Sequence, residues 1–104
     1  MHFTSFLEEG RLTVALNGEI DHHCAKAFIQ AISAKIEAYT PDVCILDFQD
    51  VSFVDSSGIA VIIRVSRRMK TLGGRAWIEN PAKQPQRVID AAGIDRLVPV
   101  ALGK

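Results

Sequence analysis

The sequence predicts one α/β domain, in which helices pack on a central mixed β-sheet. Two observations support this fold class. The 104 residues are 48% apolar and carry as many acidic as basic side chains, which is usual for a globular domain with its own core. Strand-like and helix-like stretches alternate in the order β-β-α-β-α-β-α-β, the pattern of a sheet whose parallel strands are joined by right-handed crossovers. Residues 1–104 are therefore expected to form a single domain.

The chain is expected to begin with an antiparallel hairpin. Two stretches, Phe3–Glu8 and Leu12–Ile20, are separated by a Glu-Gly-Arg turn signal at residues 9–11. In the second stretch, apolar residues alternate with polar or small ones, which is the period of a strand with one buried face. The mixed sheet is therefore predicted to start at this hairpin.

An amphipathic helix is predicted from His22 to about Tyr39. Asp21 is a suitable N-cap for it, and Pro41 prevents its continuation. Apolar side chains recur at steps of three and four residues, so that they share one face. These side chains are Cys24, Ala27, Phe28, Ala31, Ile32 and Ile36.

The second half of the chain is predicted to alternate strands with helices. Val43–Phe48 is apolar on both faces over most of its length, as in a central strand covered on both sides. A helix follows from Ser56 to about Leu72 and is closed by two glycines, with basic residues in its last turns that suit the helix dipole. The remaining elements are a short strand at Ala76–Glu79, a helix at Gln84–Ala92 and a last edge strand at Leu97–Leu102.

The net charge of zero conceals a division between two halves. Residues 1–55 carry three basic and nine acidic side chains, a net of −6, whereas residues 56–104 carry nine basic and three acidic ones, a net of +6. Such asymmetry favours a charged partner surface. The balanced total does not favour a protein that binds nucleic acid through its overall charge.

Cysteine usage and hydropathy indicate a cytoplasmic protein without a membrane segment. Cys24 and Cys44 have no further Cys or His at a zinc-site spacing, so they are expected to be buried thiols rather than metal ligands or a disulfide. The first ten residues include two glutamates and no long apolar run, unlike a signal peptide. The central apolar run Ile59–Ile63 is far shorter than the roughly 20 residues that cross a bilayer.

The candidate site is the segment Phe-Val-Asp-Ser-Ser-Gly-Ile at residues 53–59, where a strand-like run changes to a helix. Asp55 or Ser56 fits the N-cap of that helix, and Gly58 permits close approach of another part of the chain. A hydrolase is not favoured, because the Gly-x-Ser-x-Gly pattern is missing. A phosphate-binding loop is not favoured, because one glycine without a following lysine cannot form the required cradle. No catalytic residue is predicted.

Two further clusters have ordinary interpretations. His22 and His23 are adjacent and do not face the same way on a helix, so they are not expected to bind a metal together. The second cluster is basic and consists of Arg64, Arg67, Arg68, Lys70 and Arg75. No aromatic residues are interleaved with it, so a solvated helix face is favoured over a nucleic-acid site.

Part of the helix that starts at Ser56 is predicted to be an exposed apolar surface. Apolar residues surround its first turns, and a helix in a domain of this size seldom buries its whole circumference. Ala60, Val61 and Val65 are expected on sides that do not face the core. These three residues are therefore candidates for contact with a partner.

Two motifs resemble those of anti-sigma factor antagonists, the bacterial single-domain STAS proteins. The first is Gly-Glu-Ile-Asp-His-His at residues 18–23, and the second is Val-Ser-Phe-Val-Asp-Ser-Ser-Gly at residues 51–58. The order of elements agrees with this family over nearly the whole chain, and residues 87–94 resemble its last helix. The arginine-rich run at residues 64–68 is more basic than is usual in the family. The resemblance implies the STAS fold.

The resemblance also implies a binding protein rather than an enzyme. Members of this family bind an anti-sigma factor that is also a serine kinase, and so free a sigma factor. Phosphorylation of a serine by that kinase ends the binding, and a phosphoserine phosphatase reverses it. The matching serine is the one directly after Asp55, which is Ser56, with Ser57 as second choice. The residues expected to contact the partner are Glu19, Asp21, His22, His23, Asp55, Ser57, Gly58, Ala60, Val61, Arg64, Val65 and Arg68.

Two other functions are kept as alternatives. A constitutive STAS subunit of a transporter or signalling scaffold would use the same surface without a phosphorylation switch. Nucleic-acid binding through the arginine cluster is a third hypothesis, which a strong inverse dependence on salt would support. The resemblance implies no cofactor, metal, membrane or direct nucleic-acid partner, and the free chain is expected to be a monomer.

Overall fold

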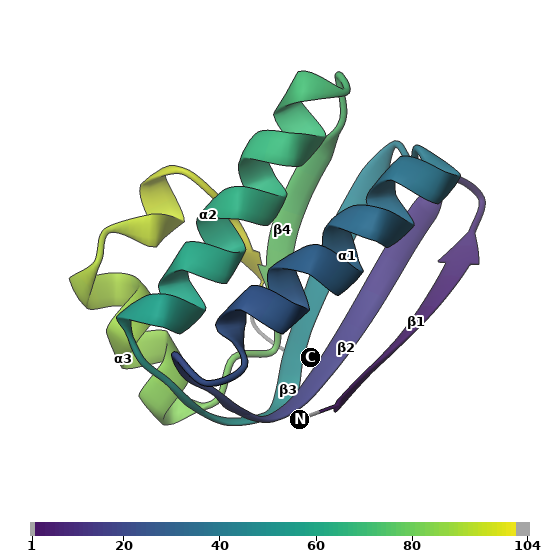
Figure 1. The fold of residues 1–104 in the computed structure, drawn as a ribbon. Coiled ribbons are helices and arrows are strands. Elements are labelled where there is room, and N and C mark those ends of the chain that lie inside the picture. The colour runs from purple at the N-terminus through teal and green to yellow at the C-terminus, as the bar shows by residue number, and fades with distance from the viewer. Residues whose placement is uncertain (1, 102–104) are drawn as a thin grey trace.

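The computed structural model describes residues 2–101 as a five-stranded β-sheet with helices packed on it (Figure 1). The strands are β1 His2–Glu8, β2 Arg11–Ile20, β3 Val43–Val54, β4 Arg75–Glu79 and β5 Val100–Ala101. They lie in this order across the sheet. β1 pairs with β2 antiparallel, and every other pair of neighbours is parallel. The predicted mixed sheet with an initial hairpin is confirmed.

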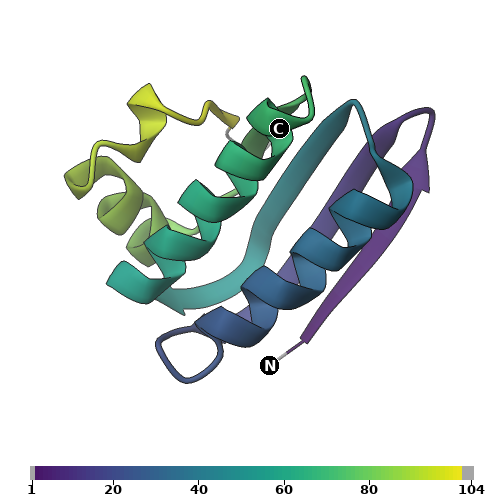
Figure 2. The same ribbon diagram turned by 45° about the horizontal axis from the view of Figure 1, so that its top comes forward.

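The helices in the described part of the chain are α1 Ala25–Tyr39, α2 Ser56–Thr71, α3 Lys83–Ala91 and the short 3-10 helix η1 Ile94–Arg96. α1 and α2 lie side by side across one face of the sheet, and α3 packs against β3 beyond α2 (Figures 1 and 2). The predicted order of strands and helices is confirmed. The helix η1 is an addition that the sequence pattern did not indicate.

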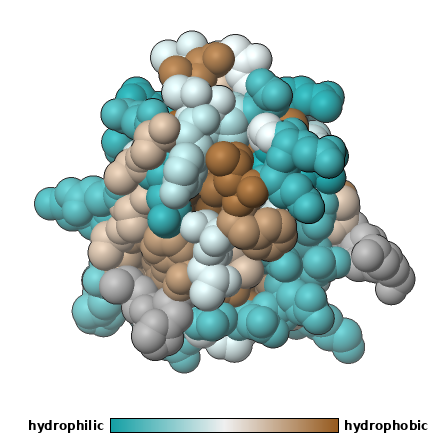
Figure 3. Space-filling view, turned by 90° about the vertical axis from the view of Figure 1, so that its right-hand side faces the viewer, coloured by the Kyte–Doolittle hydropathy of each residue, from teal (hydrophilic) through white to brown (hydrophobic). Residues whose placement is uncertain are grey.

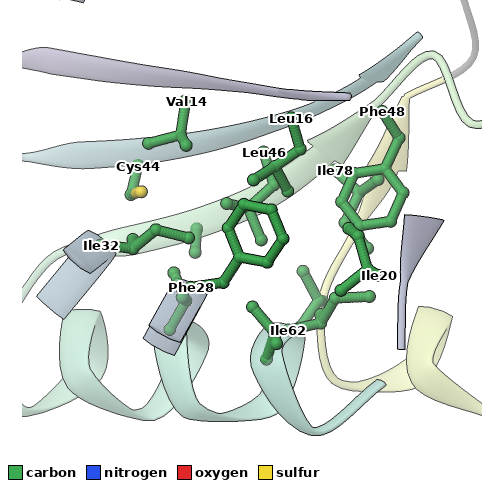
Figure 4. Packing of buried hydrophobic residues seen from close by; sticks show 14 of the residues in the cluster. Val14, Leu16, Ile20, Phe28, Ile32, Cys44, Leu46, Phe48, Ile62 and Ile78 are labelled. Atoms are coloured by element: carbon green, nitrogen blue, oxygen red, sulfur yellow. The ribbon is translucent and has the colours of Figure 1, made fainter. Parts of the chain in front are cut away.

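The core lies between the sheet and the two long helices (Figure 4). Phe28 and Ile32 of α1 and Ile62 of α2 point toward the strands and are at most 1% exposed. Alternate residues of β3 such as Leu46 face these helices, as the pleat of a strand dictates. Ile45, on the opposite face of β3, is also buried. The interpretation of this segment as a central strand is therefore confirmed.

A two-residue turn joins β1 to β2. Glu9 and Gly10 have φ angles of 53° and 78°, as a tight hairpin turn requires. The Gly10 carbonyl accepts hydrogen bonds from the backbone N–H groups of Asp42 and Val43. A Cβ atom at residue 10 would lie 2.6 Å from a carboxylate oxygen of Asp42. Glycine therefore allows the hairpin turn to pack against the start of β3.

The predicted start of α1 is wrong by three residues. The helix begins at Ala25 instead of His22, because the segment before it forms a separate turn. The Asp21 carbonyl accepts hydrogen bonds from the backbone N–H groups of Cys24 and Ala25. The Asp21 side chain accepts one from the N–H of His23. Asp21 therefore stabilises this turn and is not the N-cap of α1.

β3 is longer than the predicted Val43–Phe48. The register between β2 and β3 shifts after Ala15, which pairs with Asp47, so that Asn17 pairs with Asp50. An extra residue in one strand of a pair is a β-bulge, and it allows pairing to continue past a polar stretch. β3 consequently extends to Val54, which is buried in the core.

The C-terminal strand begins three residues later than predicted. Within residues 2–101, Val100 and Ala101 pair with β4, whereas Leu97 lies outside the strand and is 58% exposed. The backbone N–H of Val98 donates to the carbonyl of Ile94, which continues the turn of η1. Pro99 has no N–H to donate to a strand neighbour. Leu102, the predicted end of this strand, lies outside the described residues.

The surface beside β1 contains both apolar and hydrophilic side chains. On the side where β1 forms the edge of the sheet, apolar side chains lie among hydrophilic ones (Figure 3). No helix in residues 2–101 is long and apolar enough to cross a bilayer.

Cys24 and Cys44 are both buried, as predicted. Burial raises the pKa of the Cys44 thiol to about 12.

Candidate functional site

The two sequence motifs meet at one end of the sheet, where the parallel strands β2 and β3 finish. This end is called the edge that holds the site. β2 and β3 are parallel, and in their register Ile20 lies opposite Val54. The backbone N–H of Asp55 reaches the Ile20 carbonyl at 3.4 Å. The segments that follow the two strands therefore leave the sheet side by side, at the edge where ligand sites of α/β folds are usually found. This edge holds Asp21–His23 next to Asp55–Gly58.

Asp55 is the N-cap of α2. Its Oδ1 atom accepts hydrogen bonds from the backbone N–H groups of Ser57 at 2.8 Å and Gly58 at 3.2 Å. These are two of the N–H groups that a helix start leaves without a partner. Ser56 is thus the first residue of the helix and does not cap it. The alternative that Ser56 is the N-cap is wrong, because the longer Asp55 side chain already occupies that position.

Ser56 is exposed, whereas Ser57 is half-buried. Within the described residues, the Ser56 hydroxyl has no hydrogen-bond partner. The hydroxyl lies at the positive end of the α2 dipole, where a negative group is stabilised. The local geometry therefore leaves Ser56 accessible to a modifying enzyme.

Gly58 holds the first turn of α2 against the sheet. A Cβ atom at this position would lie 2.8 Å from the backbone carbonyl oxygen of Ile20 and 3.0 Å from Cβ of Val54. No side chain can be added there without a shift of backbone or core atoms. The close approach that the sequence suggested for Gly58 is therefore made to the ends of β2 and β3.

Asp21 organises the turn that precedes α1. Its Oδ1 atom accepts from the His23 backbone N–H at 3.0 Å, and its Oδ2 atom lies 3.6 Å from Nδ1 of His23. Desolvation raises the pKa of Asp21, but hydrogen bonds from His23 and Cys24 and the charge of the imidazole outweigh it and lower that pKa. The Cys24 thiol donates to the Glu19 carbonyl at 3.2 Å. Asp21 therefore holds His23 and the turn that leads into α1.

Gln84 of α3 fixes the end of β3, a contact that no sequence motif indicated. Its side-chain amide donates to the Val54 carbonyl at 3.0 Å and accepts from the Val54 N–H at 2.9 Å. This pair of bonds replaces a strand neighbour, because β4 pairs only with Val43–Asp47 of β3. Gln84 thereby positions the residue directly before Asp55.

The predicted partner-contacting residues differ in exposure. Those on the surface are Glu19, His22, His23, Ala60 and Arg64, and those half-buried are Asp21, Asp55, Ser57 and Arg68. Phe53, which no prediction assigned to contact, is 40% exposed at the end of β3. In the strand register it lies opposite Glu19. An exposed aromatic ring therefore adjoins the polar residues of this edge.

Three of the predicted contact residues are buried, and their assignment to the partner surface is wrong. Val61 and Val65 are fully buried in the core, and Gly58 is buried as well. α2 packs against α1 as well as against the sheet, so the flank that carries the two valines is covered. The exposed apolar surface predicted for α2 is reduced to Ala60 on its outer side.

The arrangement offers a surface for binding and a serine for modification. No group of three or more His, Cys, Asp or Glu side chains in residues 2–101 is placed to hold a metal ion. His22 and His23 lie with their rings 4.0 Å apart, and both are exposed. The features that remain are an accessible serine at a helix start and a polar surface around it.

The sequence and the structure are both similar to those of known proteins. A family model described as the STAS domain matches residues 7–103. The anti-sigma F factor antagonist of Lysinibacillus sphaericus is 30% identical over 95 residues, which are 90% of this chain and 81% of that protein. The anti-sigma factor antagonist SpoIIAA in its unphosphorylated form is 26% identical, with a TM-score of 0.82 over 96% of this chain and 88% of SpoIIAA. The phosphorylated form of SpoIIAA from Bacillus is 26% identical, with a TM-score of 0.74 over 96% of this chain and 91% of SpoIIAA.

Proposed function

This chain belongs to the STAS domain family, and we propose that it is an anti-sigma factor antagonist switched by phosphorylation of Ser56. In its unphosphorylated form it binds an anti-sigma factor that is also a serine kinase, and so releases a sigma factor. The kinase phosphorylates Ser56 and the complex dissociates; a phosphoserine phosphatase restores the binding form. The chain is a binding module and a kinase substrate, not an enzyme. The proposal includes a cytoplasmic location, because sigma factors act in transcription.

One observation carries this proposal: an exposed serine begins α2 beside an aspartate that already caps the helix. Because Asp55 binds the N–H groups of the first turn, the fold does not depend on the Ser56 hydroxyl. A kinase can therefore modify Ser56 without removing a stabilising hydrogen bond. The similar proteins named anti-sigma factor antagonists support this function, and the phosphorylated form of SpoIIAA supports a phosphorylation switch on this fold.

The proposed partner surface surrounds Ser56 at the edge of the sheet. Apolar area on Phe53 and Ala60 favours association by roughly 25 cal/mol per Å² before the cost of ordering. Charged and polar groups select the partner and fix its orientation. The surface consists of Glu19, Asp21, His22, His23, Phe53, Asp55, Ser57, Ala60, Arg64 and Arg68.

Phosphorylation would act through charge and not through refolding. A phosphate on Ser56 adds about −1.5 to −2 charge at neutral pH, and the start of α2 tolerates it because of the helix dipole. A partner shaped for the unmodified surface must bury this charge beside the carboxylates of Asp21 and Asp55. Disruption of a buried polar contact at an interface commonly costs about 2–5 kcal/mol, which weakens binding about 30-fold to several thousand-fold.

The test uses Ser56→Ala as bait in extracts of the native cell. We expect it to retain an anti-sigma factor when ATP is present, whereas the wild-type chain is phosphorylated and released. Ser56→Glu is expected to bind the partner about 30-fold to several thousand-fold more weakly without ATP. Ser57→Ala is the matched control, because it removes the neighbouring hydroxyl and leaves Ser56 available. Intact mass after incubation with the captured kinase and ATP measures the modification.

The outcomes separate the alternatives. A Ser56→Ala chain that still gains phosphate and is released would show that another residue, with Ser57 first in line, carries the switch. A wild-type chain that gains no phosphate from a kinase to which it binds would favour a constitutive STAS subunit of a transporter or scaffold. Circular dichroism of each variant checks that the loss of binding does not come from unfolding.

A further inference from the structure

A polar groove runs between α1 and α2, away from the core. Its volume is about 340 Å³. α1 contributes a hydroxyl and a carboxylate to it, and α2 contributes three guanidinium groups and a second hydroxyl. The lining residues are Ser33, Glu37, Arg64, Arg67, Arg68 and Thr71. The groove is therefore a built concavity with an excess of positive charge.

The arginines of the groove are incompletely neutralised. Arg68 forms an ion pair with Glu37 across the two helices, but its Nε atom is shielded from solvent without a hydrogen-bond partner. Arg64 and Arg67 are exposed, and no carboxylate in residues 2–101 lies within 4.0 Å of either. Like charges three and four positions apart on a helix repel one another. A ligand that brings negative charge into the groove would relieve this repulsion.

The groove is continuous with the partner surface around Ser56. Ser56, Ala60, Arg64 and Arg67 follow one another along α2 at steps of four, four and three residues, so they lie on one side of the helix. Ser56 and Arg64 are about 12 Å apart along the helix axis, from the rise of 1.5 Å per residue. A protein docked over Ser56 can therefore also reach the groove.

We propose that the contact surface for the anti-sigma partner extends from Arg64 and Arg68 into this groove and that the groove receives a carboxylate-rich segment of that partner. Guanidinium groups match carboxylates with paired, charge-assisted hydrogen bonds. The groove contains no aromatic side chain on which bases could stack and does contain the carboxylate of Glu37, which disfavours nucleic acid. This inference rests on the proposed function for the identity of the partner, but not for the chemistry of the segment.

The distance to Ser56 assigns the groove a distinct role. Because Arg64 lies more than two helical turns from Ser56, a phosphate there would not compete for the groove. The acidic segment would then add the same increment of affinity in both states, while Ser56 decides whether the rest of the surface binds. Removal of the groove charges should weaken the unmodified complex and the Ser56→Glu complex by the same factor.

The first experiment needs no partner protein. We expect a labelled short poly-L-glutamate peptide to bind the wild-type chain at low ionic strength, and the double variant Arg64→Gln, Arg67→Gln to bind it about tenfold more weakly or worse. The matched control is Arg87→Gln, Arg96→Gln, which removes the same charge from exposed positions on α3 and η1. Thermal unfolding of both double variants checks the fold.

Three results would overturn the inference. These are no binding of the peptide to the wild-type chain, an equal loss in the control variant, or tighter binding of inorganic pyrophosphate or duplex DNA than of the peptide. The second experiment repeats the comparison with the anti-sigma factor captured by Ser56→Ala. Since the peptide assay does not involve Ser56, failure of the phosphorylation switch and failure of the groove can be told apart.

Discussion

Asp55 and Ser56 divide between them two tasks that lie at one helix start. Asp55 accepts the hydrogen bonds that begin α2, whereas Ser56 is exposed and carries the proposed modification. If Ser56 were the cap, its phosphorylation would also alter the stability of the helix. The observed arrangement separates the switch from the fold, so that the modified and unmodified chains can keep the same structure.

Asp55→Ala should lower the free energy of unfolding by about 1 kcal/mol, because two N–H groups at the start of α2 lose their acceptor. Asp55→Asn should recover most of this loss, since an amide oxygen can accept the same bonds. Urea unfolding of the three proteins measures both effects. Equal destabilisation by alanine and asparagine would mean that the negative charge of Asp55, and not its hydrogen bonds, stabilises the helix.

Val61 and Val65 show that the burial of a residue on the side of a helix cannot be predicted from its position in the sequence alone. Their positions on α2 suggested an exposed apolar surface, but both are fully buried. Burial on the flank of a helix depends on the neighbouring helix, here α1, and that neighbour is set by the tertiary fold. Asp21 is a similar case, because an aspartate before a helical pattern can serve either as an N-cap or in a turn of its own.

At the scale of elements, the junction of β2, β3 and α2 sets the geometry of the site. Gly58→Ala should destabilise the protein by about 1–3 kcal/mol, because the added methyl group meets the Ile20 carbonyl oxygen and forces α2 outward. At an exposed helix position the same change would instead stabilise by about 1 kcal/mol. Urea unfolding measures the free energy of unfolding of both proteins and shows whether Gly58→Ala raises or lowers it.

Ala60→Gly is the control for this prediction, because it makes the reverse change on the exposed side of the same helix. It measures the local effect of helix propensity, about 1 kcal/mol, without a contact to the sheet. A Gly58→Ala protein that is as stable as the wild type or more stable would show that the first turn of α2 can move away from β2 at little cost.

The elements with a regular hydrophobic period could be predicted from sequence, and those fixed by single tertiary contacts could not. The hairpin, α2 and β4 lie within one or two residues of their predicted bounds, because turn signals and alternation are local. The C-terminal strand and the two hydrogen bonds between Gln84 and Val54 depend on segments that meet only in the folded chain. The pairing of the two motifs at one edge follows from the parallel register of β2 and β3.

For the whole molecule, the division of charge in the sequence becomes a division of the surface. The acidic first half supplies Glu19, Asp21 and Asp55 at the edge of the sheet, and the basic second half supplies the arginines of the groove. A partner that contacts both regions therefore meets carboxylates at one of them and guanidinium groups at the other. Such an alternating pattern fixes the orientation of the partner more than it raises affinity.

The stability of the whole domain should fall in alkaline solution because of Cys44, which lies in the core on the central strand. Its pKa is about 12 in the folded chain and 9.0 ordinarily. Between these values the unfolded chain has lost the thiol proton while the folded chain keeps it, so unfolding becomes easier as pH rises. From about pH 7 to about pH 10 this lowers the free energy of unfolding by about 1.4 kcal/mol, because about pH 10 lies one unit above the ordinary pKa of the thiol.

Cys44→Ala and Cys44→Val test this prediction by urea unfolding at both pH values. Each variant changes packing and therefore shifts stability by a constant amount, but both lack the titrating thiol. Because other groups that titrate in this range are common to all three proteins, the wild type should lose about 1.4 kcal/mol more than either variant. Parallel pH profiles for all three would contradict the prediction, since they would mean that water reaches Cys44 in the folded chain and that the core between β3 and the helices opens locally.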